Sequence, residues 1–167
     1  MAEPLVIYHS HIMPYAVFRP TAVYGPGDKE MSPLFRITRH GILPMVGQPA
    51  MRFGLLHVND LVTAILCWLS TKVPVRGVYE LDDGKPGGYD SQSVAAIAQE
   101  VWKRPVYCIF LPGPLISLIA NINLWLARLL HYSQMLTPGK VRELQNPDWI
   151  CDITPLTQAL PNWQPRL

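Results

Sequence analysis

Short apolar runs alternate with polar, Gly- and Pro-rich stretches along this chain, and this pattern predicts many brief elements. Runs typical of buried strands span residues 15–20, 43–46, 53–58, 77–82 and 105–110. Apolar stretches that follow a capping residue or a proline predict helices over residues 32–41, 61–69, 94–103, 115–131 and 137–144. Because strands alternate with helices, we expect an α/β fold with some parallel pairing.

Polar residues between these runs predict the turns and helix starts. The segment 21–28 is rich in Gly and Pro and is expected to be a loop. Asn59-Asp60 supplies an N-cap for the helix at 61–69, and Ser91 or Ser93 caps the next helix. Asp82-Asp83 is interpreted as a solvated turn, because adjacent side chains on a strand point to opposite sides.

Composition excludes two classes of protein. Apolar residues make up 49% of the 167 residues and charged residues 16%, against about 25% in an average soluble domain, which excludes intrinsic disorder. The net charge of +2 is too balanced for a nucleic-acid-binding surface.

The apolar stretch 115–130 contains Asn121, Asn123 and Arg128, whereas a membrane span needs about 20 apolar residues. We expect a buried or interface helix there.

The cysteines, the N-terminal residues and two histidines give expectations about cellular location and metal binding. Cys67, Cys108 and Cys151 are far apart and form no Cys-x-x-Cys pair, so we expect small buried thiols in a reducing cytoplasm. Residues 1–5 lack the basic and apolar regions of a signal peptide. His9 and His11 have no third ligand nearby, and no metal site is expected.

Three segments stand in an order and spacing that resemble a known family. They are Phe18-Arg-Pro-Thr-Ala-Val-Tyr-Gly-Pro-Gly-Asp28, Arg52-Phe-Gly-Leu-Leu-His-Val-Asn-Asp-Leu61 and Val78-Tyr-Glu-Leu81. Near the end comes Trp163-Gln-Pro165, with Asn162 where glycine is usual. Together they resemble the strand, loop and helix-cap signatures of the extended short-chain dehydrogenases/reductases, the NAD-dependent epimerase/dehydratase family.

The resemblance implies the C-terminal part of a Rossmann-like α/β fold, as a single incomplete domain. It assigns residues 1–27 and 53–83 to the Rossmann sheet, and residues 28–52 and 84–167 to the substrate-binding region. The family's glycine-rich dinucleotide loop is absent. Its Tyr-x-x-x-Lys pair is absent too, because none of the seven tyrosines has lysine four residues on. We therefore expect the N-terminal glycine-rich half to be lacking, and we assign no catalytic residue.

Five residues are candidates for binding by the same resemblance. Pro20, Thr21 and Val23 match the loop whose backbone meets the nicotinamide in the family, a contact suited to a strand's carboxyl end. Tyr24 could line the substrate pocket. Arg52 stands where nucleotide-sugar enzymes of the family hold a diphosphate, which a guanidinium fork suits. Each candidate has a purely structural alternative. Pro20, Thr21 and Val23 could simply form a rigid strand end, Tyr24 could pack against neighbouring side chains, and Arg52 could be a solvated arginine on a strand edge.

Two functions follow from these interpretations, and whether the chain is an enzyme stays open. The first is the substrate-binding half of an NAD(P)-dependent epimerase/dehydratase or oxidoreductase. Complete relatives use NAD or NADP; this chain alone is expected to be inactive and to bind the cofactor weakly or not at all. The alternative is a non-catalytic binding or assembly module that uses the exposed sheet edge and the apolar helix 115–130. The expected partners are a second copy or the missing N-terminal half, and a small-molecule substrate; neither nucleic acid nor a membrane is expected.

Overall fold

The chain folds into two compact units in the computed structural model, which describes residues 8, 14–29, 31–46, 49, 51–72, 75–112, 118 and 148–166. The first unit comprises Met1–Pro26, Phe53–Gly88 and Ile150–Leu167, and the second comprises Gly27–Arg52 and Tyr89–Trp149. Apart from Leu118, the helices predicted at 115–131 and 137–144 lie outside the described residues, as do His9 and His11.

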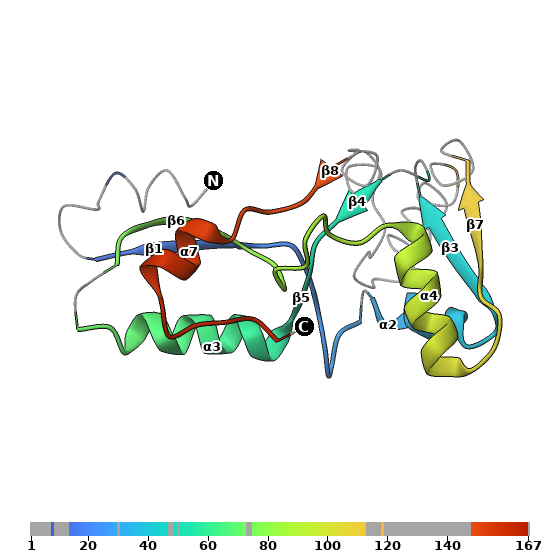
Figure 1. Cartoon of the computed structure of the whole chain (residues 1–167), viewed down its shortest axis with the longest axis horizontal. Helices are drawn as coiled ribbons and strands as arrows, with labels where there is room; N and C mark the ends of the chain where they lie inside the picture. The colour runs from blue at the N-terminus through green and yellow to red at the C-terminus, as the bar shows by residue number, and fades with distance from the viewer. Residues whose placement is uncertain are drawn as a thin grey trace, which may run out of the picture. The chain divides into compact units, whose positions relative to one another are not determined.

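Two parallel strand pairs, which Figure 1 shows in sequence colours, form the frame of the first unit. In the first pair, β1 (Ala16–Pro20) runs beside β6 (Gly77–Leu81). In the second pair, β2 (Ala22–Tyr24) runs beside β5 (Leu55–His57). The strands predicted at 15–20 and 77–82 are confirmed. The loop predicted at 21–28 is wrong for its first half, because β5 supplies a partner strand that local Gly and Pro content cannot reveal.

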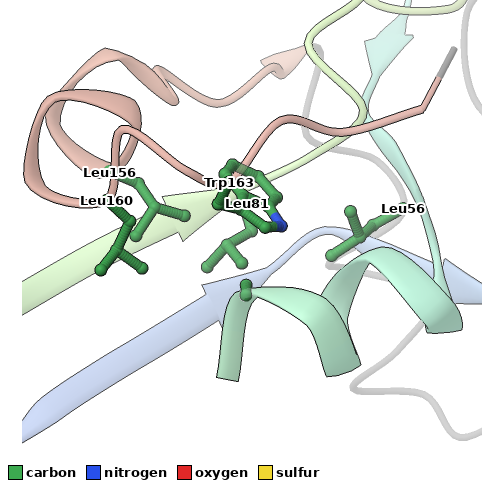
Figure 2. Packing of buried hydrophobic residues seen from close by; sticks show 6 residues of the cluster. Leu56, Leu81, Leu156, Leu160 and Trp163 are labelled. Atoms are coloured by element: carbon green, nitrogen blue, oxygen red, sulfur yellow. The ribbon is translucent and has the colours of Figure 1, made fainter. Parts of the chain in front are cut away.

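The core of the first unit forms around Trp163, near the end of the chain. This side chain is 1% exposed and packs with buried residues of β5, β6, the helix α3 (Val58–Leu69) and the helix α7 (Thr154–Ala159). In Figure 2, Leu156 and Leu160 approach Leu81 and Trp163 from the α7 side. The tail from Ile150, which the sequence grouped with residues 84–149, therefore packs in the first unit. Which part holds a substrate stays a prediction.

The second unit is built on a parallel pair of its own. The strand β3 (Ile42–Val46) runs beside β7 (Tyr107–Leu111), and one face of the pair packs on α4 (Ser91–Trp102). The helix α2 (Ser32–Thr38) joins α4 through a hydrogen bond from the Trp102 indole N–H to the Thr38 hydroxyl, at 2.9 Å. The buried residues of this core are Leu43, Ala95, Ala98 and Val106.

The helix limits in the second unit follow from capping rather than from serine content. Asp90, and not Ser91 or Ser93, is the N-cap of α4: its carboxylate accepts the Ser93 N–H at 2.7 Å while the Ser93 hydroxyl accepts the Asp90 N–H. Lys103 ends the helix in the left-handed conformation, at φ 51°. The predicted start at residue 94 is therefore three residues late.

Within the described part of the chain, no helix is both long enough and apolar enough to span a membrane. The three cysteines are free thiols, each partly buried.

Candidate binding site at the strand ends of the first unit

The strand that carries the first motif changes its partner at Thr21. β1 is in register with β6 as far as Pro20 opposite Leu81, and β2 then continues beside β5, with Ala22 opposite Leu55. The Thr21 N–H and hydroxyl both donate to the Leu81 carbonyl, at 2.9 and 3.3 Å. The carboxyl ends of β1 and β6 thus lie together, which in open parallel sheets is where ligands bind.

Gly54 leaves no room for a side chain beside this junction. A Cβ placed on Gly54 would lie 2.9 Å from the Cβ and Oδ2 of Asp82 and 2.9 Å from Cγ2 of Thr21. On the other side, the Asp83 N–H donates to the Leu55 carbonyl at 2.8 Å, which continues β6 toward β5. The glycine therefore lets three chain segments meet, and its place inside a strand-like run was the one sequence signal for such a close approach.

Asp82 and Asp83 are buried, which corrects the prediction of a solvated turn. They are 3% and 5% exposed, and their carboxylates accept the N–H groups of Gly84 and Lys85, at 2.8 and 3.1 Å. Burial raises the pKa of Asp82, and the neighbouring charge of Asp83 raises it further, while the backbone N–H of Gly84 opposes the rise. The turn that leads away from β6 thus carries negative charge into the interior of the unit.

Tyr24 lies at the end of β2 against the ring of His57. The two ring centroids are 5.3 Å apart and the planes meet at 78°, an edge-to-face contact. Burial raises the pKa of Tyr24, and the carboxylates of Asp83 and Asp60 raise it further. The phenol therefore keeps its proton at neutral pH and can donate a hydrogen bond, whereas a general base would need a lowered pKa.

His57 is the N-cap of α3, a role that the sequence assigned to Asn59-Asp60. Its Nδ1 accepts the Asn59 N–H at 3.3 Å, so the helix begins at Val58. Asp60 is instead a residue of the first turn, 2% exposed, and its carbonyl accepts the Trp163 indole N–H at 3.0 Å. The helix predicted at 61–69 therefore starts three residues earlier than its sequence pattern indicated.

Arg52 lies in the second unit. It begins β4 (Arg52–Phe53), which pairs with β8 (Asp148–Trp149). Its Nη2 is 2.7 Å from Oδ2 of Asp148, and the two side chains are 51% and 49% exposed. Asp148 is 96 residues away in the chain, and nothing in the sequence pointed to it.

The first-unit site combines groups that can form hydrogen bonds with a ligand. It offers backbone groups at Pro20–Val23, a protonated phenol at Tyr24 and buried carboxylates. Among the described residues, no three His, Cys, Asp or Glu side chains gather in a way that could hold a metal ion. The roles of Pro20, Thr21, Val23, Tyr24 and Arg52 in binding stay predictions.

Comparison with known sequences gives one relative of note. No family model matches the chain. The chain is similar to the protein named ceramide reductase of Caulobacter vibrioides (strain NA1000 / CB15N), with 31% identity over 148 residues. The match covers 87% of this chain and 45% of the relative, so the chain spans about half the length of the curated protein it matches.

Comparison with solved structures gives three informative neighbours. UDP-glucuronic acid 4-epimerase from Bacillus cereus, solved with UDP-glucuronic acid and NAD, has a TM-score of 0.63 at 16% identity, over 96% of this chain and 43% of the epimerase. Epimerase Mth375 from Methanothermobacter thermautotrophicus has a TM-score of 0.67 at 15% identity, and the match covers 99% of this chain and 43% of the epimerase. RMD from Pseudomonas aeruginosa, solved with NADPH, has a TM-score of 0.64 at 16% identity, and the match covers 99% of this chain and 48% of RMD.

The three neighbours share the fold of this chain. Each match takes in nearly all of this chain and less than half of the neighbour. The fold class predicted from the motifs is thereby confirmed. The chain has the fold of the C-terminal part of the extended short-chain dehydrogenases/reductases, the Rossmann-like proteins of the NAD-dependent epimerase/dehydratase type.

Proposed function

We propose that this chain is the substrate-binding part of an NAD(P)-dependent oxidoreductase or epimerase, and that it does not turn over on its own. The observation that carries the proposal is the change of strand partner at Thr21, which sets the backbone of Pro20–Val23 at the carboxyl ends of β1 and β6. The similarity to a ceramide reductase at 31% identity supports an oxidoreductase role.

The reaction proposed for the complete site is hydride transfer between a nicotinamide and a substrate carbon. When bound, NAD(P)H supplies the hydride to a carbonyl carbon, and a proton goes to the oxygen. This chain's own residues would orient the reactants: the neutral Tyr24 phenol can donate to a substrate oxygen, and Pro20 and Val23 can face the nicotinamide. Thr21 can act only as an acceptor, through its carbonyl and hydroxyl oxygens, because its N–H and hydroxyl both donate to Leu81.

Two substrate classes enter through the comparisons. The curated relative is named for ceramide, an uncharged lipid amide, whereas a fold neighbour was solved with UDP-glucuronic acid, a nucleoside diphosphate sugar. Both reactions would use the same nicotinamide chemistry. The proposed function covers either class.

Cofactor affinity of the isolated chain should be weak. One or two backbone hydrogen bonds contribute roughly 0.5–1.5 kcal/mol each, while association costs at least about 4 kcal/mol before any contact forms. The glycine-rich loop that would add the pyrophosphate contacts is absent from the sequence. The proposed reaction therefore needs dinucleotide contacts beyond those that these 167 residues supply.

A partner is supported by an apolar stripe on α3, formed by Val62, Ile65, Leu66 and Leu69. These four side chains recur at intervals of three and four residues, so they share one helix face, and they are between 38% and 65% exposed. Leu61, Ala64 and Trp68 on other positions of the same helix pack in the core. Within the described residues, no strand pairs with β1 on the side away from β6. A strand edge without a described partner and an apolar stripe are both surfaces that association would cover.

The partner we propose is either a dinucleotide-binding half of the same fold or a second copy of this chain in a homodimer. The alternative function, a non-catalytic assembly module, would use the same stripe and edge without any cofactor. We also place the protein in the cytoplasm, which the free thiols of its three cysteines support.

The test follows the NAD(P)H absorbance at 340 nm with alcohols, ketones and nucleotide sugars as substrates. The chain alone should give no turnover, and calorimetry should give dissociation constants above ~10 µM for NAD and NADP. Adding the separately expressed dinucleotide-binding half of the Caulobacter vibrioides relative should restore turnover. Activity of the isolated chain that survives repurification would refute the proposal, and an assembled complex that binds no cofactor would favour the assembly module.

The association itself is tested by light scattering. The wild-type chain should be larger than a monomer at ~100 µM, and Leu66→Ser with Leu69→Ser should reduce association, because the pair removes apolar area from the stripe. Gln92→Ser on the exposed face of α4 is the matched control. A monodisperse monomer for the wild-type chain would show that the stripe and the edge need no partner.

A further inference from the structure

Two helices of the second unit end at the same place, and the turns that follow them are bonded to each other. The Trp102 indole N–H donates to the Thr38 hydroxyl at 2.9 Å, and Nη1 of Arg104 donates to the Arg39 carbonyl at 3.0 Å. Figure 1 shows α2 and α4 leading through these turns into β3 and β7, whose first residues lie side by side. The ends of both helices and the starts of both strands therefore form one contiguous surface.

Four exposed cations gather on this surface, and one carboxylate opposes them. The cations are Arg36, Arg39, Lys103 and Arg104, and the carboxylate is that of Glu100 in the last turn of α4. Four cations and one carboxylate leave three positive charges, more than the net +2 of the whole chain. Among the residues that the structure describes, none of the four cations forms an ion pair with a carboxylate. The helix dipoles favour a cation at each C-terminus, but four like charges at one end repel one another unless an anion lies opposite.

Large apolar side chains are exposed beside these cations. Ile42 is 40% exposed, and Tyr107, its neighbour across the strand pair, is 70% exposed. Val101 is 62% exposed, while Ile37 and Trp102 are 41% and 39% exposed. A single exposed apolar residue is ordinary on a protein surface, whereas five of them together indicate an interaction surface.

Lys103 occupies a position where glycine would fit the backbone better. Its φ of 51° and ψ of 38° are left-handed, and it is the one described residue other than glycine with a positive φ. Helices commonly end on glycine in this conformation, because a side chain there adds backbone strain. Stability alone therefore does not account for a lysine here, and a positive charge is what glycine would lack.

We propose that this surface docks the protein on an anionic phospholipid membrane, with the four cations at the lipid phosphates and the five apolar side chains at the headgroup boundary. Basic residues beside tryptophan, tyrosine and aliphatic side chains are the combination that interfacial attachment uses. A nucleic acid would engage the cations and the aromatic rings, but it offers no apolar contact to Ile37, Ile42 and Val101.

The proposal concerns the second unit alone and does not rest on the proposed function. Attachment at the membrane surface needs no membrane-spanning helix. It therefore replaces the sequence-based expectation that no membrane is involved, which weighed only the apolar stretch 115–130 as a spanning segment.

The test is sedimentation of the whole chain with phospholipid vesicles at low salt. Each basic residue near an anionic surface contributes about fivefold to binding, so three net charges should favour vesicles with ~30% phosphatidylglycerol over pure phosphatidylcholine about a hundredfold. Raising the salt to ~500 mM should remove most of this preference, because the charges are then screened. Val101→Ser should weaken binding to the anionic vesicles about threefold without changing its salt dependence, because apolar contact is not screened.

Lys103→Gly separates docking from stability. It should weaken binding to the anionic vesicles about fivefold while the melting temperature stays the same or rises, because glycine fits the left-handed backbone. Adding Arg39→Gln should bring the loss to about 25-fold. The matched control is Lys72→Gly with Arg166→Gln, which removes the same two charges from exposed residues of the first unit and should change binding less than about twofold.

Three results on vesicles would each overturn the proposal. They are wild-type binding that does not differ between anionic and neutral vesicles, equal losses in the Lys103/Arg39 pair and the control pair, and wild-type binding strength in Lys103→Gly. Tight binding of a single-stranded oligonucleotide of ~20 nucleotides, with no binding to vesicles, would assign the surface to nucleic acid instead. A chain that docks on anionic vesicles but forms no complex with NAD(P)H turnover would keep the docking surface and refute the oxidoreductase assignment.

Discussion

Replacing Trp163 with phenylalanine should test how the tail holds the first unit together. The indole is 1% exposed, contacts buried residues of four elements, and donates its N–H to the carbonyl of Asp60 at 3.0 Å. That carbonyl lies in the first turn of α3, three residues after His57, whose ring contacts Tyr24. Loss of the indole would therefore loosen both the core and the helix end beside the candidate site.

The expected cost of Trp163→Phe has two parts. Losing the hydrogen bond costs about 1 kcal/mol, because the Asp60 carbonyl still accepts the Thr63 hydroxyl at 3.0 Å. The smaller ring leaves roughly 40 Å³ unfilled, which at about 24 cal/mol per Å³ costs about 1 kcal/mol, and lost transfer free energy adds a similar amount. The sum is about 3 kcal/mol, a large fraction of the roughly 5–15 kcal/mol that stabilises a typical domain.

Urea unfolding followed by circular dichroism measures this cost. With a slope of about 2 kcal/mol per molar urea, the midpoint should fall by about 1.5 M. Trp149→Phe makes the same chemical change at a side chain that is 42% exposed, and it should cost less than about 0.5 kcal/mol. If the two variants unfold at the same urea concentration, Trp163 is not the centre of the core and the assignment of the tail to the first unit is wrong.

Three further predictions concern buried groups of the first unit. Burial raises the pKa of Asp82 above its ordinary 3.8, so ionising this carboxyl as the pH rises above 3.8 lowers the stability of the wild-type chain. The free energy of unfolding of Asp82→Asn minus that of wild type, from urea titrations at several pH values, should therefore increase with pH. A difference that stays constant with pH would contradict this. Gly54→Ala should lower the free energy of unfolding by about 2 kcal/mol, because its Cβ would lie 2.9 Å from atoms of Asp82 and Thr21; an unchanged melting temperature would show that the junction can widen. Burial raises the pKa of Cys151 to about 11, so little thiolate is present at pH 8 in the folded chain. Iodoacetamide should therefore label Cys151 much more slowly in the folded chain than in urea, as followed by mass spectrometry. Equal rates would show that the thiol is accessible.

Elements with strong local signals were predictable from the sequence. The strand at 77–82 alternates and the strand at 15–20 is a short apolar run closed by Pro20, and both are present as β6 and β1. The helix at 94–103 was found with its end nearly right, because Pro105 follows closely and limits it. Its start was missed because the capping residue, Asp90, precedes the serines that the pattern favoured.

The strand β2 was missed because its stability depends on a distant partner. Ala22–Tyr24 is only three residues long, and with Pro20 and Gly25 close on either side it is indistinguishable from a loop by its own sequence. It becomes a strand because Leu55–His57 lies parallel to it, and this pairing joins segments more than 30 residues apart. The family resemblance supplied the order of the motifs but not the change of partner at Thr21, which is what places the candidate cofactor contacts.

The burial of Asp82 and Asp83 shows why charge is a poor guide to exposure at such a junction. Two adjacent aspartates favour a solvated turn, because an ionised carboxylate loses solvation free energy when it is buried. Here the turn itself offsets part of that loss, since the N–H groups of Gly84 and Lys85 reach the carboxylates, and Gly84 takes a φ of 74° that other residues rarely adopt. With Gly54 bringing a neighbouring strand against Asp82, the chain holds negative charge next to Tyr24. Burial raises the pKa of Tyr24, and the carboxylates of Asp83 and Asp60 raise it further, so the phenol is suited to donating a hydrogen bond and not to accepting a proton from a substrate.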